Sequence, residues 1–145
     1  MDADGRRYHG ARRWETSAIE TFVELASGVD FLYPPDWSDR DQIVFRTARA
    51  DIPFAVLRTD KPTLLRLILH IRNPQEAATI QRKLGVFTRA TRSPEGRNQA
   101  ELTIRTPHRL GSFAFREFFE EYVEKFRRLC GLPPGPSKRD RLLPL

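Results

Sequence analysis

Hydrophobic residues follow two different spacings in the first half of the chain. From Thr16 to Gly28 they recur every three or four positions, which predicts a short amphipathic helix that ends at the glycine. An irregular loop over 30–41 follows, and its Trp37 is expected to cover the core. Three short apolar segments then favour strands: 42–47, 54–59 and 63–72. Their short connections predict an antiparallel meander.

The last of these segments shows the clearest alternation of apolar and polar residues. One face carries Leu65, Leu67, Leu69 and Ile71. The opposite face is mixed and carries Leu64, Arg66, Ile68, His70 and Arg72. Because successive side chains of a strand point to opposite faces of a sheet, we expect one face to be covered and the other to be partly in contact with water.

The second half of the chain predicts a helix, a hairpin and a longer helix. Asn73 and Pro74 indicate a helix start with Asn73 as the cap, and the helix continues to Leu84 before Gly85. The hairpin strands and their turn are expected at 87–91, 100–106 and 93–96. The final helix carries a broad apolar stripe of Phe115, Phe118, Phe119, Tyr122, Val123, Phe126 and Leu129.

These elements together predict an α+β fold with about five strands in a largely antiparallel meander sheet, with helices packed mainly on one face. A length of 145 residues suits one domain, which we place at 16–131. Residues 1–15 are predicted to be a basic flexible arm, and 132–145 a proline-rich basic tail. The apolar stretches are too short to cross a bilayer and the first 14 residues lack the apolar region of a secretory signal, so we expect a cytoplasmic protein without membrane contact.

The sequence offers few candidates for catalysis. The three histidines, His9, His70 and His108, stand in no recognisable catalytic motif, and Cys130 lies on the apolar stripe of the last helix. The acids between 30 and 41 match no metal-binding spacing, and no glycine-rich phosphate loop is present. We therefore predict no catalytic residue, no metal and no cofactor. An enzymatic function, a third possibility beside the two binding roles described next, would need a pocket formed by Trp37, Asp39, His70 and Arg58.

Basic residues suggest a different role. The formal net charge is +6 and the isoelectric point is near 10.1, which favours attraction to polyanions. The candidate nucleic-acid-binding residues are Arg58, Arg66, Arg72, Arg89 and Arg105. On a water-facing strand surface they would contact phosphate backbones without reading bases. We therefore predict a non-catalytic accessory or binding domain. The alternative is a protein–protein interaction module that uses the apolar end 142–145.

The order of motifs carries a family resemblance. An acidic loop with a WxxxD pattern is followed by FAVLRT, LLRLILHI, RKLG and FREFFEEYVEKFRR, over about Trp37 to Arg128. This order resembles a small α+β domain of unknown function that occurs alone or appended to nucleases and transport-type proteins. It is also similar to an accessory segment of some paralogues of the ATPase component of excinuclease ABC, a DNA-repair enzyme. The resemblance implies an accessory or DNA-associated role. It assigns no functional residue, because the ATPase motifs and zinc-binding cysteines of that enzyme do not occur in this chain.

Overall fold

A computed structural model describes residues 16–49, 51–60, 64–105 and 107–132 of the chain. The predicted arm and nearly all of the predicted tail lie outside these ranges. Its elements, in chain order, are α2 (Thr16–Ser27), β1 (Gln42–Phe45), β2 (Ala55–Arg58), β3 (Leu65–His70), α3 (Gln75–Leu84), β4 (Thr88–Arg92), β5 (Asn98–Ile104), the 3-10 turn η1 (Pro107–Gly111) and α4 (Phe113–Cys130). No helix in the described part of the chain is long and apolar enough to span a membrane.

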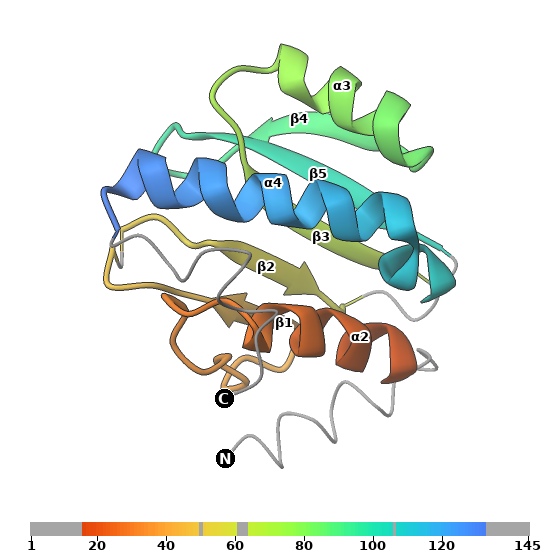
Figure 1. The fold of residues 1–145 in the computed structure, drawn as a ribbon, viewed down its shortest axis with the longest axis horizontal. Coiled ribbons are helices and arrows are strands. Elements are labelled where there is room, and N and C mark those ends of the chain that lie inside the picture. The colour runs from red at the N-terminus through yellow and green to blue at the C-terminus, as the bar shows by residue number, and fades with distance from the viewer. Residues whose placement is uncertain (1–15, 50, 61–63, 106, 133–145) are drawn as a thin grey trace, which may run out of the picture.

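The strands form one antiparallel sheet in the order β1-β2-β3-β5-β4 (Figure 1). The α+β class and the five-stranded antiparallel sheet are thus confirmed. Only β1 to β3 follow one another as a meander. After α3 the chain enters the sheet at its edge as β4, and the hairpin then brings β5 back beside β3. This order pairs the two longest strands at the centre of the sheet, with β3 against β5 from Leu65 to His70.

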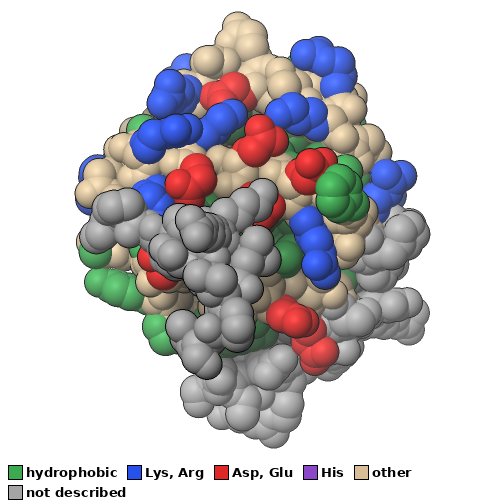
Figure 2. All heavy atoms as spheres, in the orientation of Figure 1, with side chains coloured by type: hydrophobic (Ala, Val, Ile, Leu, Met, Phe, Trp, Pro, Cys, Tyr) green, Lys and Arg blue, Asp and Glu red, His purple; other side chains and the backbone are tan. Residues whose placement is uncertain are grey.

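Helices α2 and α4 lie across one face of the sheet, and α3 lies near β4 (Figure 1). Helix α4 begins at a cap in which the Ser112 hydroxyl accepts a 3.1 Å hydrogen bond from the backbone amide of Phe115. It ends at Gly131, whose φ of 64° is a left-handed conformation that glycine adopts without strain. Basic and acidic side chains are interspersed on the outside of this helical layer (Figure 2).

The predicted cap of α3 is wrong. The N-cap position is Pro74, and no side chain caps the helix there. Instead the Glu76 carboxylate reaches back and accepts hydrogen bonds from the backbone amides of Arg72 and Asn73, at 2.5 and 3.2 Å. This carboxylate satisfies two backbone amides that precede the helix, and its negative charge in the first turn interacts favourably with the positive end of the helix.

Aromatic rings fill the space between the helices and the sheet. Phe54 lies at the centre, with ring centroids 5.1 to 5.9 Å from those of Phe31, Phe119, Tyr122 and Phe126. Most of these pairs meet edge to face, the arrangement that aromatic quadrupoles favour. Trp37 is buried in the same core, as expected from the sequence. Its loop also covers the edge of β1, where Asp36 pairs with Val44.

Candidate interaction face

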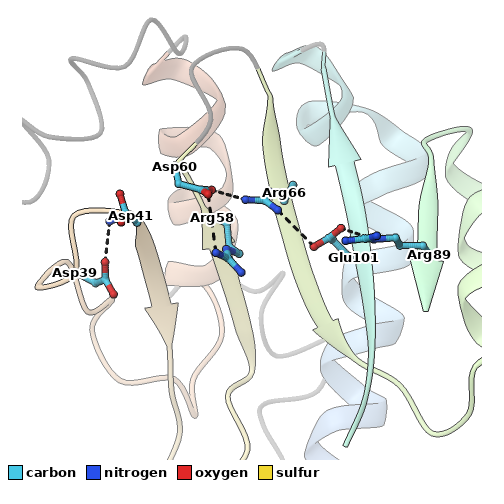
Figure 3. Close-up of polar contacts among 7 residues, drawn as sticks. All are labelled: Asp39, Asp41, Arg58, Asp60, Arg66, Arg89 and Glu101. Carbon is cyan, nitrogen blue, oxygen red and sulfur yellow. Dashed lines mark hydrogen bonds and ion pairs between the residues drawn. The ribbon is translucent and has the colours of Figure 1, made fainter. Parts of the chain in front are cut away.

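Strand register determines which side chains lie on the face of the sheet opposite α2 and α4. Leu57, Leu67 and Leu102 are opposite one another and fully buried beneath the helices. Their neighbours along each strand therefore point to the other side. There Arg58 is paired with Arg66 across β2 and β3, and Glu101 is paired with Arg89 across β5 and β4. In Figure 3 these side chains stand in front of the sheet while the helices lie behind it.

These four side chains and Asp60, which follows β2, form a continuous chain of ion pairs, which we call the outer-face ladder. Its members are Arg58, Asp60, Arg66, Glu101 and Arg89 (Figure 3). Asp60 lies 3.9 Å from Arg58 and 2.5 Å from Arg66. Glu101 lies 3.9 Å from Arg66 and 2.7 Å from Arg89. The ladder crosses β2, β3, β5 and β4, so it joins strands that are far apart in the sequence.

The middle of the ladder is buried and its ends are exposed. The side chains of Arg66 and Glu101 are 16% and 9% exposed, whereas those of Arg58 and Arg89 are 40% and 58% exposed. Burial tends to raise the pKa of Asp60. The hydrogen bond and charge of Arg66, with the charge of Arg58, outweigh burial and lower that pKa below its usual value. Asp60 therefore remains a carboxylate at neutral pH, and the ladder presents fixed charges of alternating sign.

The structure brings together only some of the five predicted arginines. Arg58, Arg66 and Arg89 lie on one face, as expected, but Asp60 and Glu101 balance two of their three charges. Arg105 follows β5 and is exposed. Arg72 follows the end of β3 and lines a groove between α3 and α4 instead. The pairing of these arginines with acids leaves no local signal in the sequence, because only the hairpin register and the order of strands place Glu101 between Arg66 and Arg89.

The aspartates of the acidic loop before β1 bind residues close to them in the sequence. One Asp36 oxygen accepts from the amide and hydroxyl of Ser38, and the other is 2.7 Å from Arg46. Asp39 accepts from the amide of Asp41 at 2.8 Å. Within the described ranges, no group of three or more histidine, cysteine, aspartate or glutamate side chains is placed to hold a metal ion. These carboxylates therefore shape the turns of the loop.

The residues considered for an enzymatic pocket are not neighbours in one cavity. His70 lines the groove between α3 and α4, whose described lining does not include Trp37, Asp39 or Arg58. The side chains of His9 and His108 lie outside what the structure describes. Cys130 is buried at the end of α4, and this burial raises the pKa of its thiol, so it packs as a small apolar side chain.

No protein-family model, curated protein or solved structure matches this chain. The resemblance of residues 37–128 to a small α+β domain and to a segment of excinuclease paralogues therefore stays a prediction.

Proposed function

We propose that the chain is a non-catalytic binding domain that contacts a partner protein through the outer-face ladder. The observation that carries this proposal is the ladder itself, in which five alternating charges lie across four strands on the face opposite α2 and α4. Every carboxylate in it is held by at least one arginine, and such mutual pairing suits a fixed recognition surface better than proton transfer.

Alternating charge favours a protein partner over a polyanion. A phosphate backbone presents charges of one sign, so it would meet Asp60 and Glu101 as well as the arginines. A protein surface can place acids opposite Arg58 and Arg89 and a base opposite Asp60. Such complementarity contributes mainly to specificity and to the rate of association, and mismatched partners are rejected by like-charge contacts.

The same face also supplies apolar surface. Val56 and Ile68 are opposite each other on β2 and β3, and both are partly exposed. Ile68 is in turn opposite Glu101, so these side chains adjoin the ladder. A partner that covers Val56 and Ile68 gains burial of apolar area, while the surrounding charges fix its orientation.

A second candidate, contact with nucleic-acid backbone as an accessory domain, is favoured by the distribution of the remaining positive charge. Segments 1–15 and 133–145 hold seven of the 25 basic residues but four of the 19 acidic ones, so they contribute +3 of the net +6. Arg58, Arg89 and Arg105 add exposed guanidinium groups on the described domain. Counterion release from phosphates would then provide the affinity.

Binding of labelled single- and double-stranded oligonucleotides at low and moderate salt separates the two candidates. Fluorescence anisotropy would compare the full chain with an Arg58→Glu, Arg89→Glu, Arg105→Glu variant. A matched variant reverses three exposed arginines elsewhere, Arg82→Glu, Arg116→Glu and Arg128→Glu. Salt-sensitive binding lost only in the first variant would establish the nucleic-acid candidate and reject the protein candidate as the main role of this face. Absence of binding at low salt would exclude nucleic acid.

The protein candidate requires its own measurement. Quantitative capture from cell extract would compare wild type with a ladder variant, Arg58→Glu with Arg89→Glu, and with a matched variant, Arg82→Glu with Arg128→Glu, which reverses two exposed arginines outside the ladder. A protein retained by wild type and the matched variant, but lost by the ladder variant, would then be purified and its dissociation constant measured with all three. Our proposal expects weakening of at least tenfold in the ladder variant alone, the size expected when charges at a complementary interface are reversed. Equal affinity for all three proteins would refute it.

A further inference from the structure

A groove of about 120 Å³ lies between α3 and α4, on the helical side of the sheet and away from the outer-face ladder. Its floor is apolar and includes Ile80, Phe118, Phe126 and Leu129. Leu129 is 37% exposed, so part of this floor is open to solvent. A dry, apolar cavity of roughly 150 Å³ is large enough for a benzene ring. The groove is smaller than this, but it is open to solvent at Leu129, so one ring or a short alkyl chain can lie in it with an edge exposed.

The floor is held rigidly. The rings of Phe118 and Tyr122 are stacked with centroids 6.3 Å apart. The Tyr122 hydroxyl is fully occupied, because it donates to the carbonyl oxygen of Phe54 and accepts from the backbone amide of His70. Tyr122 thus contributes a fixed wall and no free polar group. A preformed apolar site binds small ligands at a lower ordering cost than a flexible one.

The charged rim has an excess of available positive charge. Both acids that line the groove are engaged, since Glu121 lies 3.7 Å from Lys83 and Glu76 accepts from two backbone amides. Arg72 and Lys125 line the same groove and form no ion pair with any described residue. The groove is thus lined by three cations (Arg72, Lys83 and Lys125) and two carboxylates (Glu76 and Glu121), which gives a net formal charge of +1 that favours a ligand with a negative group.

His70 adds a neutral polar group at the end of β3. Its ring centroid is 6.5 Å from that of Phe126, and neither ring nitrogen hydrogen-bonds a described residue. Burial and the charge of Arg97 lower its pKa below the usual value. At neutral pH the imidazole is therefore uncharged, with one nitrogen able to donate and the other able to accept.

From these contacts we infer that the groove binds a small amphipathic carboxylate. Its ring or alkyl group would lie on Phe118, Phe126 and Leu129, and its carboxylate would face Arg72 and Lys125. Guanidinium and ammonium groups bind carboxylates through charge-assisted hydrogen bonds, which are stronger than those between neutral groups. His70 would offer a further donor to the polar end of the ligand. For a ligand with about ten heavy atoms, we expect a dissociation constant on the order of 0.1–1 mM.

The test is an NMR titration of the ¹⁵N-labelled full chain with phenylacetate, alongside phenylacetamide, which has the same shape without the charge. We expect shifts of the backbone amides of Ile71, Lys83 and Leu129 that saturate with phenylacetate. Phenylacetamide should bind at least fivefold more weakly. Equal binding of the two compounds would overturn the carboxylate assignment, and no saturable shift at these amides up to 10 mM phenylacetate (about ten times the weakest expected dissociation constant) would overturn the site.

Matched variants separate the rim from a general effect of charge. Arg72→Ala with Lys125→Ala removes both rim cations, whereas Arg82→Ala with Arg128→Ala removes two exposed cations that do not line this groove. All four side chains are exposed, so both variants should fold, which circular dichroism checks. The rim variant should bind phenylacetate at least fivefold more weakly and lose the preference over phenylacetamide. Equal weakening in both variants would show non-specific attraction to a basic protein and overturn the inference.

Discussion

The hydroxyl of Tyr122 in α4 donates a 2.5 Å hydrogen bond to the carbonyl oxygen of Phe54, the residue just before β2. The same hydroxyl accepts a 2.9 Å hydrogen bond from the backbone amide of His70 at the end of β3. One side chain therefore joins the longest helix to two strands, at the start of one and the end of the other. Its burial raises the pKa of the phenol, so it stays protonated and able to donate.

We expect Tyr122→Phe to lower the free energy of unfolding by about 1–3 kcal/mol, because it leaves a buried carbonyl and a partly buried amide without their shared partner. The ring and its packing against Phe54 are retained. Urea denaturation measures the change. Tyr33→Phe removes a hydroxyl from a side chain that is 55% exposed, and it should change stability by less than about 0.5 kcal/mol. Equal effects of the two substitutions would contradict the structural role of Tyr122.

The sequence predicted the elements of this fold better than their polar connections. Alternation at Leu65, Leu67 and Leu69 identified β3, and the helical spacing of aromatic residues identified α4, because burial of one face leaves a direct mark on the sequence. The hydrogen bond between Tyr122 and Phe54 joins residues 68 positions apart, and no local pattern reveals it. Such contacts depend on how the elements pack.

In the candidate site, too, the strands could be predicted from the sequence but their polar contacts could not. The alternation within 63–72 placed Arg66 on the mixed face of its strand, which was expected to be partly in contact with water. It could not show that β5, rather than β4, lies next to β3, and this order is what brings Glu101 within reach of both Arg66 and Arg89. The face that was predicted to be basic therefore carries positive and negative charges in alternation. Counting arginines along the chain overestimated the free positive charge of the sheet.

Glu101 should be the most sensitive member of the outer-face ladder. We expect Glu101→Gln to lower the free energy of unfolding by roughly 1–3 kcal/mol, since it removes the charge that Arg66 and Arg89 share while Arg66 remains mostly buried. Urea denaturation at pH 7 would measure it. Glu95→Gln makes the same chemical change in the exposed hairpin turn and should have an effect below about 0.5 kcal/mol. A neutral result at Glu101 would mean that the ladder adds nothing to stability.

Two aspartates predict how stability changes with pH. Hydrogen bonds from Ser38 and Arg46 lower the pKa of Asp36, and the pKa of Asp60 is lowered because Arg66 and Arg58 outweigh its burial. A carboxyl whose pKa is lower in the folded than in the unfolded chain stabilises the fold above the unfolded value, near 3.9 for aspartate. That contribution is lost as pH falls through the folded pKa.

Unfolding free energy should therefore decline from about pH 5 downward, and Asp60→Asn should flatten this decline while being less stable than wild type at pH 7. Urea midpoints at pH 7, 5, 4 and 3 test the prediction. If Asp60→Asn follows the wild-type curve at every pH, the ion pairs of Asp60 do not contribute to stability.

The cap of α4 offers a local prediction that is independent of the ladder and the groove. The Ser112 hydroxyl accepts from the amide of Phe115 and donates to the carbonyl oxygen of Arg109, so it joins η1 to the helix. We expect Ser112→Ala to lower the free energy of unfolding by about 1 kcal/mol, because an amide at the start of the helix loses its acceptor. Ser112→Thr retains a hydroxyl at the same position and should keep most of the wild-type stability. Thermal and urea denaturation of both variants would measure the difference, and equal losses in Ser112→Ala and Ser112→Thr would show that packing around residue 112, and not the cap, fixes the start of α4.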